Sequence, residues 1–272
     1  MLKTMIIATD LDGTLLDDSK LVGEQEQKWL LDFLSKGNVL AFLTSRNMKD
    51  VKTCVPWMLE LEGCKRYIGF DEGARLLLPD NRIVEMPKMN ISQVIEAIEQ
   101  IQDQIIGFTV FYDGGHYDIV FSWRKLVVLK LKGFIKREHS GRYLSWKVFK
   151  KKKDLLFWKI KPVVSSQKRK PIYEMFRHDL NGYCVTLNEG RIEIMHSESG
   201  KLGALKYICR KEKISIHDVF YFGDEGNDLY CMEQTTSYAM GNAPDWIKSV
   251  ARNTTDDNNH HGVYKILNKL TI

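Results

Sequence analysis

Short apolar runs alternate with amphipathic segments at both ends of the chain, and this pattern predicts buried strands connected by helices. The runs are continuous rather than alternating, which is typical of strands buried on both faces; they occupy 5–8, 39–43, 67–70, 219–222 and 238–240. The segments between them place apolar residues at helical spacing; they include 24–36, 201–211, 227–233, 243–251 and 263–270. We therefore expect an α/β fold with a doubly wound, Rossmann-like parallel sheet.

The pattern changes in the middle of the chain. An amphipathic helix is predicted over 91–105, and the runs 108–112 and 116–121 form a hairpin across Asp113-Gly114-Gly115. A second hairpin should turn at 188–190. Antiparallel pairs with helices between them are typical of an α+β unit. We expect a core made of residues 1–86 and 193–272, interrupted by an inserted unit over 87–192.

Length and composition are those of an ordinary globular protein. The chain has 272 residues, of which 44% are hydrophobic and 28% charged, which suits two domains. No apolar run approaches the roughly 18 residues of a membrane helix, and the N-terminus becomes acidic too soon for a signal peptide. The five cysteines are scattered and form no Cys-x-x-Cys pair. We expect reduced thiols and a cytoplasmic location.

Charge is distributed unevenly along the chain. The net charge is +5, but residues 124–178 contain 18 Lys and Arg residues and three acidic residues, giving that segment +15 and the remainder −10. A basic helix is predicted over 125–138, and Lys150–Lys153 form a run of four lysines. The segment is either a solvated surface or a surface that attracts anions, and both interpretations remain open.

The first strand is followed by a pair of carboxylates. Asp10 and Asp12 are separated by Leu11, and period-2 geometry in an extended chain would turn both to the same side. Gly13 then allows the backbone to turn. Two crowded carboxylates repel each other, so a bound cation or a shared proton is expected to offset that cost. The plain alternative is a strand that ends in an Asp-Gly turn.

This stretch resembles the first motif of the haloacid dehalogenase-like superfamily, Asp-x-Asp-Gly-Thr after an N-terminal strand. Thr44-Ser45-Arg46 is similar to the second motif, and Lys201, which opens a helix, is similar to the third. The stretch from Gly223 to Asp228 matches all four specified positions of the fourth motif, Gly-Asp-x-x-Asn-Asp. The resemblance covers the whole chain and is nearest to the Cof-type phosphatases, which insert a large α/β cap between the second and third motifs.

The sequence departs from the Cof-type pattern at two positions. Leu202 follows Lys201, where that branch usually has Gly. Glu72 precedes Gly73-Ala74, where the branch commonly has Asn. An additional carboxylate near the site could alter selectivity for the substrate.

The resemblance implies a role for each matched residue. Asp10 would be the nucleophile and Asp12 the general acid and base. Because Asp10 and a phosphate are both anionic, a divalent ion has to screen them, and Mg²⁺ prefers oxygen ligands. Its expected ligands are Asp10, the backbone carbonyl of Asp12, Asp224 and, directly or through water, Asp228. The phosphate would be held by Thr44, Lys201, Asn227 and the backbone N–H groups of Leu11 and Ser45.

The function that these residues predict is a magnesium-dependent phosphatase acting through an aspartyl-phosphate intermediate. A phosphomutase of the same superfamily is an alternative, and binding of a polyanion or nucleic acid through the basic segment is another. We expect a small, multiply anionic phosphorylated substrate such as a sugar phosphate, nucleotide or cofactor phosphate. Neither a membrane nor a nucleic acid is the expected partner, and the protein is expected to be a monomer or weak homodimer.

Overall fold

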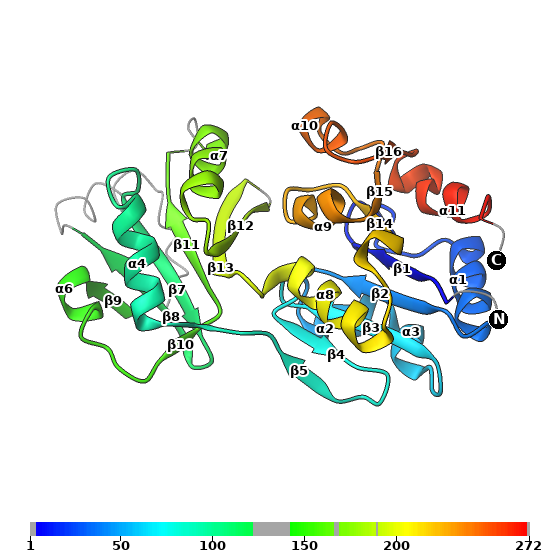
Figure 1. The fold of residues 1–272 in the computed structure, drawn as a ribbon, viewed down its shortest axis with the longest axis horizontal. Coiled ribbons are helices and arrows are strands. Elements are labelled where there is room, and N and C mark those ends of the chain that lie inside the picture. The colour runs from blue at the N-terminus through cyan, green and yellow to red at the C-terminus, as the bar shows by residue number, and fades with distance from the viewer. Residues whose placement is uncertain (1–3, 122–141, 166–168, 189, 271–272) are drawn as a thin grey trace. The chain divides into compact units, whose positions relative to one another are not determined.

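The computed structural model describes residues 4–121, 142–165, 169–188 and 190–270 (Figure 1). The chain forms two compact units, unit 1 over Met1–Met86 and Glu198–Ile272 and unit 2 over Pro87–Ser197. The pattern predicted that the chain returns to unit 1 at residue 193, whereas in the structure it returns at Glu198. The reason is that the last strand of unit 2, β13 (Arg191–His196), remains paired with its neighbour as far as His196.

Unit 1 is built on an eight-stranded sheet. Its strands in spatial order are β16 (Asn253–Thr254), β15 (Thr236–Ala239), β14 (Val219–Gly223), β1 (Ile6–Thr9), β2 (Val39–Leu43), β3 (Lys65–Phe70), β4 (Arg75–Leu77) and β5 (Ile83–Glu85). The first six run parallel, and β4 and β5 add an antiparallel edge. The predicted parallel sheet is confirmed, and β1 lies inside it.

Helices cover both faces of this sheet, as a doubly wound fold requires. They are α1 (Glu24–Ser35), α2 (Met48–Cys54), α3 (Pro56–Glu60), α8 (Gly200–Glu212), α9 (Leu229–Gln234), α10 (Asp245–Lys248) and α11 (Gly262–Leu267). On one face, Ile7, Phe42 and Ile68 of the strands share a buried cluster with Phe33 of α1 and Val263 of α11. Helix α8 contacts β2 and β3, and α9 contacts β14 and β15.

The face that carries α8 is closely packed at β3. A Cβ atom at Gly69 would lie 2.7 Å from the side chain of Leu43 and 3.5 Å from that of Ala204 on α8. The ammonium of Lys201, in the first turn of α8, lies 3.1 Å from the carboxylate of Asp10, which directly follows β1. The N-terminus of α8 is thereby held against the carboxyl ends of the central strands.

Pro56 divides the helical segment that follows β2. The sequence predicts a kink or a new turn there, and the structure has two helices, with Pro56 in the first turn of α3. Val51 and Met58, one from each helix, are fully buried in the unit 1 core.

Unit 2 contains a six-stranded sheet in the order β12 (Tyr183–Asn188), β13, β11 (Lys159–Val163), β7 (Gly107–Tyr112), β8 (Gly115–Val120) and β9 (Arg142–Ser145). All pairs are antiparallel except β8 with β9. The helices among the described residues of this unit are α4 (Ile91–Ile101), α6 (Trp146–Phe149) and α7 (Arg169–Asp179). This is the α+β unit expected from the pattern.

Unit 2 also contains a small two-stranded sheet that the pattern did not predict. The sequence has an apolar run near 155–160, which predicts a single strand. The structure divides it into β10 (Leu156–Phe157), which pairs with β6 (Met89–Asn90), and β11, which joins the larger sheet. The basic helix expected over 125–138 lies outside the described residues. In the part of the chain that the structure describes, no helix combines the length and the apolar character needed to cross a membrane.

Candidate active site

The first, second and fourth motifs meet at the carboxyl ends of three neighbouring strands. Asp10 directly follows β1, Thr44 follows β2 and Asp224 follows β14. The backbone N–H of Asp10 donates to Phe222 O at 3.0 Å, and that of Thr44 donates to Gly69 O at 2.8 Å. The ladder hydrogen bonding therefore continues one residue past the strands and fixes where the three side chains begin. The convergence expected from the sequence is present.

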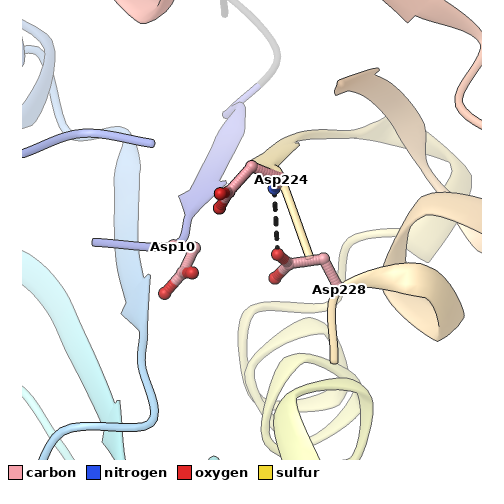
Figure 2. Close-up of side chains that lie close together, drawn as sticks. All are labelled: Asp10, Asp224 and Asp228. Carbon is pink, nitrogen blue, oxygen red and sulfur yellow. Dashed lines mark hydrogen bonds between the residues drawn. The ribbon is translucent and has the colours of Figure 1, made fainter. Parts of the chain in front are cut away.

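Three carboxylates from the first and fourth motifs form a cluster. Asp10, Asp224 and Asp228 each offer an oxygen within 4.8 Å of the others, and the side chains are grouped beyond the end of β1 (Figure 2). All three residues are less than 10% exposed, and Asp228 is fully buried. Buried carboxylates at this spacing repel one another unless cations or donors offset their charge.

Lys201 is the cation that contacts two members of the cluster. Its ammonium group lies 3.1 Å from Asp10 Oδ2 and donates to Asp228 Oδ1 at 2.7 Å. Burial alone lowers the pKa of Lys201, but the negative charges of Asp10 and Asp228 outweigh burial and raise that pKa well above its usual value. Lys201 therefore stays protonated at any physiological pH, and the first turn of α8 delivers a permanent charge beside Asp10.

Asp228 is saturated by donors from the protein. Its Oδ1 accepts hydrogen bonds from Lys201 and from the hydroxyl of Tyr221 at 2.5 Å. Its Oδ2 accepts from the backbone N–H groups of Asp224 and Glu225, both at 3.1 Å. The side chain makes no helix-capping hydrogen bond at the start of α9. Asp228 therefore braces the loop after β14 and orients Lys201.

Asp224 has fewer and weaker partners. Thr14 Oγ1 donates to its Oδ1 at 3.0 Å, and Asn242 Nδ2 donates to its Oδ2 at 3.2 Å. Burial and the charge of Asp228 raise the pKa of Asp224 to about 7. Gly13 has a left-handed backbone, and a Cβ there would lie 2.3 Å from Asp224 Oδ2, so only Gly brings the first motif this close.

The pKa of Asp10, like that of Asp224, is raised by burial and by the neighbouring carboxylates. Burial raises its pKa well above the usual value, Lys201 opposes the shift, and the charges of Asp228 and Asp224 add to it. The backbone N–H of Leu11 donates to Asp10 Oδ1 at 2.7 Å. Three buried carboxylates with one buried ammonium leave a net negative charge, and hard oxygen donors in such a cluster fit a divalent cation such as magnesium.

The side chain of Asp12 does not join this cluster, which corrects the period-2 argument. β1 ends at Thr9 and the chain turns at Leu11, so Asp10 and Asp12 are not two positions of one extended segment. Arg46 binds the Asp12 carboxylate with two hydrogen bonds of 2.5 and 2.6 Å, and Lys20 donates to it at 2.9 Å. Burial raises the pKa of Asp12, but these donors outweigh burial and hold that pKa below its usual value.

The remaining residues expected to bind phosphate differ in their burial and in their hydrogen-bond partners. Thr44 is fully buried, and its hydroxyl oxygen accepts a hydrogen bond from the Arg46 N–H at 3.2 Å. Ser45 is exposed, and Leu11 is buried with its N–H directed to Asp10. Asn227 is buried, and its amide group donates to Glu72 Oε2 at 3.0 Å.

Several residues in the site received no role from the sequence. Thr14 and Asn242 hold Asp224, and Tyr221 holds Asp228. Thr14 belongs to the first motif itself, and Asn242 lies in Gly241-Asn242-Ala243, a stretch that also resembles the Cof-type branch. Tyr221 carried no signal, because a tyrosine inside an apolar strand is indistinguishable from an ordinary core residue.

Comparison with known proteins agrees with the motifs. A family model described as haloacid dehalogenase-like hydrolase matches residues 7–267. Phosphatase YwpJ of Bacillus subtilis is 23% identical, covering 97% of this chain and 99% of its own. From the same organism, 5-amino-6-(5-phospho-D-ribitylamino)uracil phosphatase YitU is 24% identical and covers 97% of both chains.

The fold is shared with solved structures. A haloacid dehalogenase-like hydrolase from B. subtilis superposes with a TM-score of 0.69 at 20% sequence identity. The match covers 98% of this chain and all of the other. Both units therefore belong to one known architecture.

Proposed function

This chain belongs to the haloacid dehalogenase-like hydrolases, and on that premise we propose that it is a magnesium-dependent phosphatase of small phosphorylated metabolites. The observation that carries the proposal is the buried Asp10 carboxylate, which follows the central strand and lies beside Lys201, Asp224 and Asp228. Two relatives that match the chain over nearly its whole length are named phosphatases, which supports the reaction class.

Asp10 is the proposed nucleophile. A carboxylate oxygen of Asp10 attacks phosphorus, the bond from phosphorus to the leaving oxygen breaks, and a water molecule then hydrolyses the aspartyl-phosphate. The position of Asp10 supports this role, because the N–H of Leu11 and the ammonium of Lys201 each contact one of its two oxygens. These contacts fix the carboxylate without burying it completely, since Asp10 is 6% exposed.

The cluster that includes Asp10 would hold the magnesium ion. Asp10, the backbone carbonyl of Asp12 and Asp224 are the proposed ligands, with Asp228 behind them. The bound ion would neutralise the repulsion between the Asp10 carboxylate and the phosphate. The raised pKa values of Asp10 and Asp224 support this assignment, because they show that the protein alone does not offset the negative charge of the cluster. A bound cation would offset it.

The phosphate oxygens would be received by fixed donors. Lys201 supplies a charge that is present at all physiological pH values, and the Thr44 hydroxyl and the N–H of Ser45 supply neutral donors. Asp228 contributes by position, because its hydrogen bond to Lys201 keeps the ammonium beside Asp10. The charge on the phosphate would therefore be stabilised by groups that need little rearrangement.

Asp12 is the proposed general acid and base. An acid must carry a proton, but the ion pairs with Arg46 and Lys20 favour the ionised form of Asp12. We therefore propose that the Asp12 carboxylate leaves Arg46 and takes up a proton from solvent, gives that proton to the leaving oxygen, and then accepts one from the attacking water. Asp12 is partly exposed, which leaves its side chain room to turn.

A cavity in unit 2 has basic side chains in its lining, which supports the proposal that this unit binds an anionic group. This cavity, of about 580 Å³, is lined by Lys161, Arg169 and Arg191 together with Phe111 and His116. None of the four lysines of Lys150–Lys153 is among the described residues that line it. Lys150 instead pairs with Glu99 and lies over the ring of Trp146. The proposed anion contacts are therefore on β11, α7 and β13 rather than on the tetralysine run.

The direct test is the release of inorganic phosphate from a panel of phosphate monoesters by the full chain. We expect release that requires magnesium, disappears with EDTA and returns when magnesium is restored. Conversion of a sugar phosphate to its isomer without release of phosphate would instead identify a phosphomutase. Release that persists in EDTA would contradict the metal assignment.

A further inference from the structure

Glu72 is held in a backbone conformation that its side chain does not favour. It is the second of three consecutive left-handed residues, with φ values of 53° at Asp71, 62° at Glu72 and 75° at Gly73. Asn tolerates this conformation better than Glu does, because its short polar side chain bonds locally. A strained residue persists only where its surroundings impose it, and such residues gather at functional sites.

Backbone contacts impose this conformation and tie Glu72 to the active site. The N–H of Glu72 donates to Thr44 O at 3.0 Å, and the N–H of Asp71 donates to Arg46 O at 2.8 Å. A Cβ at Gly73 would lie 2.7 Å from the backbone of Gly200, at the start of α8. The loop is therefore clamped between the second motif and the helix that carries Lys201.

The side chain of Glu72 reaches the fourth motif. Its Oε2 accepts a hydrogen bond of 3.0 Å from Asn227 Nδ2, and both residues are at least 95% buried. A carboxylate can only accept hydrogen bonds, so the amide nitrogen of Asn227 has to face Glu72. The charge of Glu72 also contributes to the raised pKa of Lys201, which is in contact with Asp10.

This orientation leaves the other end of the Asn227 amide without a donor. Asn227 Oδ1 is buried, and none of the described residues donates a hydrogen bond to it. A buried carbonyl oxygen without a donor costs free energy. Turning the amide over would not remove that cost, because Oδ1 would then face the Glu72 carboxylate, which is also an acceptor, and the hydrogen bond from Nδ2 would be lost. Glu72 thus fixes which way the Asn227 amide faces.

We propose that Glu72 is a positioning residue that holds Asn227 with its carbonyl oxygen ready to accept a hydrogen bond from the ligand. The donor is either a hydroxyl or amine of the substrate close to the phosphate ester, or a water molecule carried by magnesium. This inference rests on the proposed phosphatase function. It differs from a packing role, because packing alone would not favour Glu over Asn in this conformation.

The test compares Glu72→Asn and Glu72→Gln with the parent chain. Asn relieves the backbone but is too short to hold Asn227, and Gln keeps the length but pairs with the amide in either orientation. We expect Glu72→Asn to raise the melting temperature by about 3 °C. In both variants we expect the preference for glycerol 3-phosphate over propyl phosphate, or the affinity for magnesium, to fall about tenfold.

Two measurements, substrate kinetics and magnesium calorimetry, distinguish a donor on the substrate from a donor on magnesium-bound water. If a substrate hydroxyl is the donor, KM rises for glycerol 3-phosphate only, and magnesium binding measured by calorimetry is unchanged. If magnesium-bound water is the donor, the calorimetric affinity for magnesium falls and all substrates are affected alike. Parameters equal to the parent in both measurements would overturn the proposal, as would a loss of melting temperature with a uniform fall in kcat.

Lys213→Asn is the matched control. Lys213 also has a left-handed backbone, with φ of 57°, but it is exposed at the C-terminal end of α8, about 18 Å along the helix from Lys201. Its replacement should raise the melting temperature without any change in kinetics. A parent chain that releases no phosphate would reject the proposed function, while the magnesium and melting measurements would still test Glu72.

Discussion

Asp224 and Asp228 differ in the donors that their carboxylates already accept. Asp228 binds Lys201, Tyr221 and two backbone N–H groups. Among the residues that the structure describes, Asp224 binds only the side chains of Thr14 and Asn242, at 3.0 and 3.2 Å. A carboxylate whose lone pairs are occupied is a poor direct ligand. This difference supports the proposed assignment of Asp224 as a metal ligand and of Asp228 as a residue that supports the ligands.

Asp224→Ala is therefore expected to weaken magnesium binding more than Asp228→Ala does, by about tenfold to 100-fold in affinity. Asp228→Ala should instead destabilise the fold by about 3 kcal/mol, because Lys201 loses a buried partner. Calorimetric titration with magnesium and thermal unfolding of both variants measure the two effects. The reverse ranking in the titration would contradict the ligand assignment.

Asp12 gives a second prediction at this scale. Asp12→Asn should slow hydrolysis of a poor leaving group, such as an alkyl phosphate, about 100-fold more than that of p-nitrophenyl phosphate, which departs with little need of a proton. Steady-state kcat on the two substrates measures the ratio. Equal losses on both would show that Asp12 contributes only through its backbone carbonyl.

That Asp10, Asp224 and Lys201 lie close together could be predicted from the sequence, but the hydrogen bonds and ion pairs of the candidate site could not. Asp10, Asp224 and Lys201 follow strands or open a helix in the expected order, because motif spacing reports where a chain turns. The ion pair of Asp12 with Arg46 depends on a turn at Leu11 that period-2 reasoning overlooks. The hydrogen bond between Glu72 and Asn227 joins residues 155 positions apart, and no local pattern encodes it.

At the scale of elements, continuous apolar runs identified the central strands well. The run 39–43 coincides with β2, and the others differ from β1, β3 and β14 by one or two residues at an end. Strands in unit 2 were harder to predict, because 155–160 is divided between two sheets. The division depends on which partner strand lies alongside, and that is tertiary information.

The sheet of unit 2 has its own buried charge. Glu193 on β13 is 2% exposed and pairs with Lys159 at 2.9 Å and Lys161 at 2.5 Å, both on β11. Burial raises the pKa of Glu193, but the two lysines outweigh burial and hold that pKa below its ordinary value of 4.5. A carboxyl whose pKa is lower in the folded protein stabilises the fold above its unfolded pKa and loses that effect on acidification.

Glu193→Gln should therefore destabilise unit 2 by about 3 kcal/mol at pH 7, because two lysines lose their anionic partner. The difference from the parent should shrink as the pH falls below about 4.5, where protonation removes the same charge from the parent. Denaturant unfolding followed at pH 7, 5 and 3.5 measures that difference. A destabilisation that is constant over this range would mean that packing, rather than charge, is responsible.

At the scale of the whole molecule, the uneven charge of the sequence corresponds to the division into units. The +15 segment lies entirely within unit 2, although its residues 124–141 and 166–168 are outside the described structure. Composition could predict that the two units have different roles. It could not predict which lysines and arginines line a cavity, because that depends on the sheet register that places Lys161 and Arg191 there.

The cavity of unit 2 is tested by Arg169→Gln. We expect KM for a sugar bisphosphate to rise about fivefold and KM for p-nitrophenyl phosphate to stay unchanged, because only the bisphosphate carries a second anionic group. Lys170→Gln is the matched control, since Lys170 is the next residue of α7, is exposed and does not line the cavity. The same KM for the bisphosphate in both variants would remove the cavity from the proposed function.

The central claim is that Asp10 attacks the phosphate, and the most direct measurement compares phosphate release by Asp10→Asn and by the parent chain. Both should be assayed with magnesium and p-nitrophenyl phosphate, after circular dichroism has shown that the variant is folded. Asn keeps the shape of the side chain and loses its nucleophilic oxygen. We predict that release falls at least about 10⁴-fold, and release within tenfold of the parent would contradict the assignment of Asp10 as the nucleophile.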